Sequence, residues 1–206
     1  MDFTNESYIR LKVRKILSEN QYVEIPEVPG TMNFWHGGNL NDYDDVIAQK
    51  NGRYEYGPGL YITTSYDVAS RYSKGSRKLY LITIEKGKDI QDSFLSLESV
   101  KDFMNKYVVS SKRKEIFIRL EKYIEGDMVP ADIFNNLILN SKGIKSSNTR
   151  FLREFYVNNG IDYELVFNPF GFGEDMVVLY NMKKIVNVIQ VKPGDRFEYY
   201  DLKKKK

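Results

Sequence analysis

The chain has 206 residues, 42% of them apolar, and a formal net charge of only +3. This length and composition are typical of a globular protein with one sizeable core, and they exclude a disordered chain. Acidic and basic residues are mixed along most of the sequence, which argues against a dedicated nucleic-acid binder. The exception is the run Lys203 to Lys206, which we interpret as a solvated tail, with a weak phosphate-attracting arm as the alternative.

The scarcity of cysteine and histidine excludes several kinds of site. The chain has no cysteine, so disulfides, thiolate metal sites and a cysteine nucleophile are excluded. A single histidine, His36, makes a zinc site unfavourable. The N-terminal residues carry charges throughout, and no apolar run approaches the about 20 residues that span a membrane. We therefore expect a cytoplasmic protein with no bound metal and no membrane partner.

The first part of the chain is expected to form a helix, a strand and a loop. Thr4 can cap a helix whose apolar face lies within residues 9–17. Prolines and a glycine within residues 26–30 then break the chain. Residues 31–35 are typical of a strand, and the polar stretch 39–56 is expected to be a loop with a short helix.

A strand, a helix and another strand are expected next. Residues 60–63 follow a glycine turn and predict a short strand. Thr64 and Asp67 have the spacing of a capping box, which predicts a helix over about 65–75. The apolar run 79–84 is the strongest strand signal in the chain.

Between about residues 94 and 145 the apolar pattern becomes helical. Three apolar faces at helical spacing predict three helices, the last of which has Pro130 in its first turn. These faces consist of Leu97, Val100, Met104 and Tyr107, then Ile116, Leu120, Tyr123 and Ile124, then Ile133, Phe134, Leu137 and Ile138. We expect them to form an inserted packing layer.

The last part of the chain is expected to form one helix and three strands. Asn148 can cap the helix and Gly160 can end it. The strands are predicted over 163–167, 176–180 and 185–191. Because helices and strands are mixed without a repeat or an obvious linker, we expect a single domain of the α+β class.

The only histidine stands at the end of a predicted strand, in front of two glycines. Gly37 and Gly38 would let a ligand approach the backbone N–H and C=O after His36. A carboxamide needs such a pair of one donor and one acceptor. The alternative is that His36 is a hydrogen-bonded structural residue at a strand end.

A glycine turn with two tyrosines is the second candidate segment. Gly59 lies in the turn, Tyr61 on the strand after it and Tyr72 on the following helix. This arrangement could bring two rings toward one site, where they could enclose a planar heterocycle. The alternative is that both tyrosines belong to an amphipathic core.

The order of these motifs resembles the NAD-binding half of ADP-ribosyltransferases of the His–Tyr–Glu class, which includes diphtheria toxin and the poly(ADP-ribose) polymerases. The motifs are a strand that ends in His-Gly, then Gly-x-Gly-Leu-Tyr, then Ala-x-x-Tyr. The similarity covers about 31–90 and about 151–191, and the helical stretch between them has no counterpart. The resemblance implies an α+β domain over residues 1–206 with the split β-sheet core of that family, an N-terminal helix and a helical insertion over about 94–145.

The resemblance implies a role for each matching residue. His36 would hydrogen-bond the adenosine ribose of NAD, and the backbone of Gly37 would hold the nicotinamide carboxamide. Tyr61 and Tyr72 would stack on the two sides of the nicotinamide, with Gly59 in the turn that leads to Tyr61. NAD would then be the substrate, and the chemistry requires no metal.

The third element of the family is a glutamate at the start of a late strand. After this strand the family has an Asn or Asp and then an Ile or Val, which Asn181 and Ile185 match. Counting back from these two residues without a gap places Met176 at the position of the glutamate. One extra residue in the turn would place Asp175 there instead. Glu174 would share a strand face with Met176 if the strand begins early enough, and Glu164 is a further candidate. We favour Glu174, followed by Asp175, and the alternative is that both belong to a solvated acidic turn.

The sequence therefore predicts a mono-ADP-ribosyltransferase that cleaves NAD and transfers ADP-ribose to a macromolecular acceptor, either protein or nucleic acid. A carboxylate beside the ribose would stabilise the positive charge that develops there, and the aromatic walls would position the nicotinamide. A bacterial or phage effector or toxin is the expected setting. The alternatives are an inactive module that binds NAD, ADP-ribose or nucleic acid, as Met176 would suggest, and an NAD glycohydrolase with water as the acceptor.

Overall fold

The computed structural model of the protein describes residues 28–40, 56–73, 78–169, 171 and 174–191. In these residues the fold is mixed α+β, as the sequence predicts, with five α-helices and a mostly antiparallel six-stranded sheet of order β6-β7-β2-β1-β3-β8. The chain divides into two compact units. The first takes its described residues from 1–39, 64–86 and 185–206, and the second takes them from 40–63 and 87–184.

The first unit contains three strands and one helix: β1 (Thr31–Gly37), β3 (Leu79–Glu85), β8 (Ile185–Val191) and α2 (Tyr66–Ser73). β3 pairs antiparallel with β1 on one side and with β8 on the other. The predicted strands over 31–35, 79–84 and 185–191 are thus confirmed. β1 extends two residues further than predicted, so that His36 and Gly37 lie within it.

Helix α2 packs on one face of β1. The ring of Trp35 meets the ring of Tyr66 edge to face, with 5.1 Å between the ring centroids. The remaining buried residues of this core are Ala69, Leu79, Leu81 and Val191. The helix begins one residue later than predicted, because its first turn is capped by Ser65, whose Oγ accepts a hydrogen bond from the Val68 N–H at 3.3 Å.

The second unit contains β2 (Leu60–Thr63), β6 (Tyr163–Phe167) and β7 (Asp175–Leu179). β7 pairs antiparallel with both of the others, and it begins one residue before the predicted strand. In this register Tyr61 and Glu164 both lie opposite Val178. Their side chains therefore point to the same face of the three strands.

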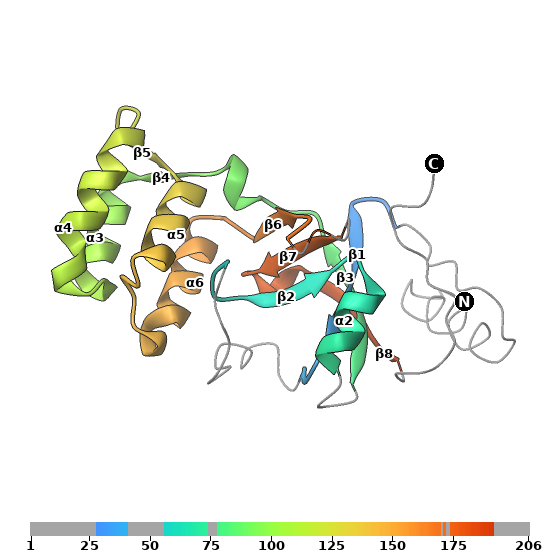
Figure 1. The fold of residues 1–206 in the computed structure, drawn as a ribbon. Coiled ribbons are helices and arrows are strands. Elements are labelled where there is room, and N and C mark those ends of the chain that lie inside the picture. The colour runs from blue at the N-terminus through green and yellow to red at the C-terminus, as the bar shows by residue number, and fades with distance from the viewer. Residues whose placement is uncertain (1–27, 41–55, 74–77, 170, 172–173, 192–206) are drawn as a thin grey trace, which may run out of the picture. The chain divides into compact units, whose positions relative to one another are not determined.

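The three helices predicted between about residues 94 and 145 are present. They are α3 (Leu97–Tyr107), α4 (Ser110–Leu120) and α5 (Ala131–Asn140), and the predicted helix after Asn148 is α6 (Thr149–Asn158). Together, α3 to α6 form the helical layer of this unit (Figure 1). Short 3-10 turns cover Ile90–Asp92, Glu121–Tyr123, Ser146–Asn148 and Met182–Lys184.

Two features of the helical layer differ from the prediction. α4 ends at Leu120, so Tyr123 is not part of its apolar face and is 46% exposed. The second difference is a two-stranded sheet of β4 (Phe94–Ser96) and β5 (Met128–Pro130), which lies at the end of the layer where α3 and α5 begin. Pro130 ends β5 and immediately precedes α5. These strands are too short to show an alternating pattern in the sequence.

Three expectations fall on residues that the structure does not describe. The expected helix over 9–17 and the lysine run Lys203 to Lys206 lie outside the described residues, as does 41–55 of the expected loop. Among the residues that are described, no helix is long and apolar enough to cross a membrane.

Replacement of Gly37 by alanine is expected to destabilise the first unit. A Cβ at this position would collide with the backbone oxygen of Ala69 and lie 2.7 Å from its carbonyl carbon and 2.9 Å from the backbone nitrogen of Ser73. The expected loss is about 1–3 kcal/mol of unfolding free energy, because α2 must move off the strand. Urea denaturation measures this loss.

Gly126→Ala is the matched control. Gly126 has φ of 60°, and a Cβ added there would have no neighbouring atom within 4 Å, so only backbone strain of about 1 kcal/mol is expected. Equal stability of Gly37→Ala and the wild-type protein would contradict the close approach of α2 to β1.

Candidate functional site

His36 and Gly37 lie side by side in β1 but point to opposite faces of it. Gly37 is on the face that α2 covers, and it is in close contact with the helix backbone. His36 is 6% exposed and points to the other face, where its ring centroid is 6.3 Å from that of Tyr80. Gly38 follows with φ of 135°, a conformation that favours glycine.

Tyr72 lies in the last turn of α2 and is 63% exposed. It belongs to the same unit as His36 and Gly37, and its helix lies on the Gly37 face of β1. An exposed tyrosine of this size is not part of the core of the unit. Its ring is thus accessible to a ligand.

Gly59 and Tyr61 belong to the second unit, at the start of β2. A Cβ on Gly59 would lie 2.6 Å from the backbone oxygen of Leu179, so only glycine fits beside β7. The hydroxyl of Tyr61 donates a hydrogen bond to the backbone oxygen of Gly57 at 2.8 Å. It also accepts one from the Tyr56 N–H at 3.4 Å. Tyr61 therefore fixes the turn that precedes its own strand.

The acidic candidates occupy three different positions around β7. Glu174 immediately precedes β7 and is 3% exposed, whereas Asp175 is the first residue of β7, is half-buried and lies opposite Phe167. Met176 is buried in the core beneath the helical layer. Side chains alternate along the strand, so Met176 shares a face with Val178 and Tyr61, and Asp175 points to the opposite face.

Glu164 is at the centre of a buried polar cluster that links strands to helices. One carboxylate oxygen of Glu164 accepts hydrogen bonds from Tyr180 Oη at 2.8 Å and from Asn135 Nδ2 at 3.0 Å. The oxygen of the Asn135 amide accepts a hydrogen bond from Tyr156 Oη at 3.0 Å. We call Asn135, Tyr156, Glu164 and Tyr180 the Glu164 cluster.

The Glu164 cluster also holds the turn before β2. Asn135 Nδ2 donates to the backbone oxygen of Tyr56 at 3.2 Å, and Tyr180 Oη lies 3.3 Å from the same oxygen. The hydroxyl of Tyr61 binds the same turn. The cluster therefore positions the segment that carries Gly59 and Tyr61.

Burial sets the protonation of the Glu164 cluster. Burial raises the pKa of Glu164 to about 7, although its hydrogen bonds with Tyr180 and Asn135 act in the opposite direction. Burial also raises the pKa of the Tyr156 and Tyr180 hydroxyls well above the usual value, so both remain protonated and can donate. Chemically, a carboxyl group of this kind can exchange a proton near neutral pH.

Sequence reasoning identified Glu164 only as a further candidate and missed its partners. Asn135 is a fully buried polar residue on the apolar face of α5. The position of Asn135 among Ile133, Phe134 and Leu137 was the one signal in the sequence that pointed to a buried polar cluster. A buried amide needs hydrogen-bond partners. The partners themselves come from residues distant in the chain.

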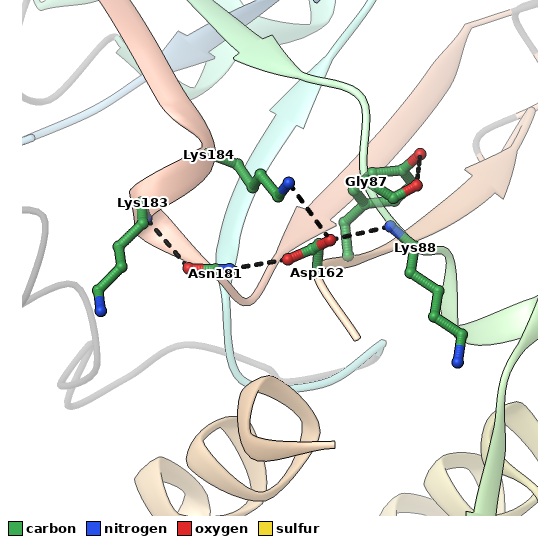
Figure 2. Close-up of polar contacts among 7 residues, drawn as sticks. Gly87, Lys88, Asp162, Asn181, Lys183 and Lys184 are labelled. Atoms are coloured by element: carbon green, nitrogen blue, oxygen red, sulfur yellow. Dashed lines mark hydrogen bonds and ion pairs between the residues drawn. The ribbon is translucent and has the colours of Figure 1, made fainter. Parts of the chain in front are cut away.

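A second polar cluster, around Asp162, joins three segments of the second unit (Figure 2). Asp162 accepts hydrogen bonds from the Lys88 N–H at 2.9 Å and from Asn181 Nδ2 at 2.7 Å, and Lys184 Nζ lies 3.8 Å away. The backbone oxygen of Asp162 accepts bonds from the N–H groups of Tyr180 and Asn181. These contacts explain Asn181 and Asp162 as structural residues.

Within the described residues, no group of three or more histidine, cysteine, aspartate or glutamate side chains is arranged to hold a metal ion. The candidates from the resemblance are divided between the two units: His36, Gly37 and Tyr72 in the first, and Gly59, Tyr61 and the acidic residues in the second. Comparison of the chain with family models, curated proteins and solved structures gives no match.

The stability of the protein is expected to fall as pH rises through the pKa of Glu164. The pKa in the folded state, about 7, is above the reference value of 4.5, so the folded state binds this proton more tightly than the unfolded chain. The stabilisation is fully present below about pH 4.5 and is lost above about pH 7, a change of about 3 kcal/mol. Glu164→Gln, which has no proton to lose, should remove this dependence.

Urea denaturation across this pH range measures the effect, with Glu98→Gln on the exposed side of α3 as the control. The control should keep the pH dependence of the wild type. An unchanged pH dependence in Glu164→Gln would contradict the raised pKa of this residue.

Loss of the Asp162 carboxylate is expected to cost about 1–3 kcal/mol of stability, because the Lys88 N–H would lose its acceptor. Asp162→Ala removes both side-chain acceptors, whereas Asp162→Asn keeps one oxygen and should lose less. Thermal and urea unfolding of the two variants test this order. Equal losses would show that the hydrogen bonds shown in Figure 2 are not the source of the stability.

Proposed function

We propose that this protein is an NAD-dependent mono-ADP-ribosyltransferase that acts on a macromolecular acceptor, either protein or nucleic acid. The observation that supports it most is the order of residues on their elements. His36 and Gly37 end strand β1, Gly59 immediately precedes strand β2, Tyr61 lies within it, and Tyr72 lies on helix α2. This is the strand, strand and helix order that the resemblance to the His–Tyr–Glu class requires.

The proposed reaction breaks the bond between the nicotinamide nitrogen and C1′ of its ribose. The bonding electron pair leaves with nicotinamide, and positive charge develops on the ribose. A nucleophilic atom of the acceptor then forms a bond to C1′ and loses a proton. Tyr61 and Tyr72 would position the nicotinamide, His36 the adenosine ribose and the Gly37 backbone the carboxamide, while a carboxylate would stabilise the charged ribose.

We assign the carboxylate first to Glu174 and second to Asp175. Glu174 is supported by its position two residues before Met176, because side-chain alternation would put it on the face of the strands that carries Tyr61. Asp175 is supported by its greater exposure. Glu164 is the least favoured of the three, because it lies on β6 and not at the start of β7.

A second candidate function is a module that binds NAD or ADP-ribose without catalysis. The observation in its favour is Met176, which stands where a gapless count places the glutamate of the family and is buried in the apolar core. Such a module would bind NAD and release no nicotinamide.

The proposal predicts that Glu174→Gln lowers nicotinamide release from NAD by about 100-fold or more, since the developing charge loses its carboxylate. Asp175→Asn should have the smaller effect. Tyr61→Ala should lower the rate by about 100-fold, because the nicotinamide is no longer held in place. Chromatography of the nicotinamide released, together with transfer of labelled ADP-ribose to macromolecules, provides both readouts.

Glu98→Gln and Tyr123→Ala are the matched controls, because both residues are exposed within the helical layer. They should keep the wild-type rate. If neither Glu174→Gln nor Asp175→Asn alters the rate, the assignment of the carboxylate is wrong. If the wild type binds NAD and releases no nicotinamide, the second candidate function replaces the first.

A further inference from the structure

One end of the helical layer concentrates positive charge. Residues 106–114 join α3 to the first turn of α4, and residues 142–150 join α5 to α6. These two segments contain seven basic residues and no aspartate or glutamate: Lys106, Lys112, Arg113, Lys114, Lys142, Lys145 and Arg150. We call this surface the basic end.

The two segments of the basic end lie side by side. Val108 and Ile144 form an isolated antiparallel β-bridge, and the Val109 N–H donates to the backbone oxygen of Gly143 at 2.8 Å. Beyond the bridge the ring of Tyr107 stacks on that of Phe151, with 4.5 Å between centroids and 19° between planes. The seven cations therefore belong to one surface, although the two segments are far apart in the sequence.

The stacked rings fix two of the cations. Lys106 Nζ lies 5.1 Å from the centroid of Tyr107, and Arg150 Cζ lies 4.5 Å from that of Phe151. Because each ring stacks on the other with one face, the cations lie on the two outer faces. Cation–π contact holds the cations in place without removing their charge.

Within the described residues, little of this charge is neutralised by ion pairs. Lys112 pairs with Glu115 at 2.9 Å, and Arg113 Nε donates to the backbone oxygen of Val108. Lys114, Lys142 and Lys145 are exposed. Helix dipoles add little to this charge, because the C-terminal ends of α3 and α5 lie here together with the N-terminal ends of α4 and α6.

The other end of the helical layer has the opposite charge. Residues 92–98 and 121–132 are held together by pairing of β4 with β5 and by a bond from the Leu97 N–H to the backbone oxygen of Asp127. They contain one basic residue, Lys122, and six acids: Asp92, Glu98, Glu121, Glu125, Asp127 and Asp132. The helical layer is thus polarised, although the whole chain is nearly neutral.

We propose that the basic end binds the phosphate backbone of a nucleic acid. A dense group of cations with a single paired acid, Glu115, is the charge pattern of nucleic-acid interfaces, which are much more positive than interfaces between proteins. Membrane-binding surfaces also present apolar side chains. Among the described residues, none of the large exposed apolar side chains lies in the two segments of the basic end.

The test measures binding of the full chain to fluorescent single-stranded DNA, single-stranded RNA and duplex DNA by anisotropy, over a series of salt concentrations and without NAD. The variant replaces Lys114, Lys142 and Lys145 by glutamine. The matched control replaces the exposed residues Lys86, Lys88 and Lys122 by glutamine, which changes the net charge equally, from +3 to 0.

We expect the wild type to bind at least one of these probes with an affinity that falls as salt rises. The basic-end variant should bind at least about tenfold more weakly than the wild type. The plot of log affinity against log salt should also be less steep, by about 2 in the magnitude of its slope. The control should remain close to the wild type. Equal weakening in the variant and the control would overturn the proposal, as would binding to acidic lipid vesicles or polyglutamate with no binding to nucleic acid.

The lysine run at the C-terminus offers a competing source of polyanion binding. A chain that ends at Leu202 should keep the affinity of the full chain if the basic end is the binding surface. Loss of binding in this variant would overturn the proposal. Because NAD is absent from these measurements, failure of NAD cleavage would contradict the proposed function and leave the binding result unchanged.

Discussion

The arrangement of the second unit depends on one buried carboxyl group. Glu164 lies on the strand face that the helical layer covers, where an unpaired carboxylate would cost several kcal/mol. It is satisfied by Tyr180 from the end of β7 and by Asn135 from α5. The same donors reach the backbone oxygen of Tyr56. One cluster thus fixes two strands, two helices and the turn before β2, and each bond depends on the others.

This constraint gives the helical insertion an internal role. The insertion has no counterpart in the family that the sequence resembles, but its residue Asn135 holds the turn on which Gly59 and Tyr61 depend. Its apolar residues cover the strand face of Met176 and Val178. The outer ends of its helices carry opposite charges. The insertion therefore supports the turn that carries Gly59 and Tyr61, and one end of the helical layer is the surface that we propose for a nucleic acid.

Periodic segments were predicted well from the sequence, and contacts between distant segments were not. The strand over 79–84 and the three helices after it have apolar spacings that packing reinforces, so they were identified, although α4 ends before Tyr123. β4 and β5 were missed because a strand of three residues shows no period. The helix cap was placed at Thr64 because either hydroxyl at 64 or 65 suits that role, and only the backbone geometry selects Ser65.

In the candidate site, too, local features could be predicted from the sequence and contacts between distant segments could not. His36, Gly37, Tyr61 and Tyr72 could be named because glycine and aromatic residues near strand ends are visible in the sequence. The partners of Glu164 could not be named, because Asn135 and Tyr180 meet it only when the strands and α5 pack together. The mixed charge of the whole chain likewise hid the basic end, which forms when residues 106–114 and 142–150 come together.

Proton NMR of NAD incubated with the wild-type protein tests the central claim most directly, because the ring protons of free nicotinamide are resolved from those of NAD. We predict that the signals of free nicotinamide grow with time. In a saturation-transfer experiment, saturation of the protein's proton resonances should reach the nicotinamide ring protons of the NAD that remains. NAD that stays intact and receives no saturation from the protein would contradict the account.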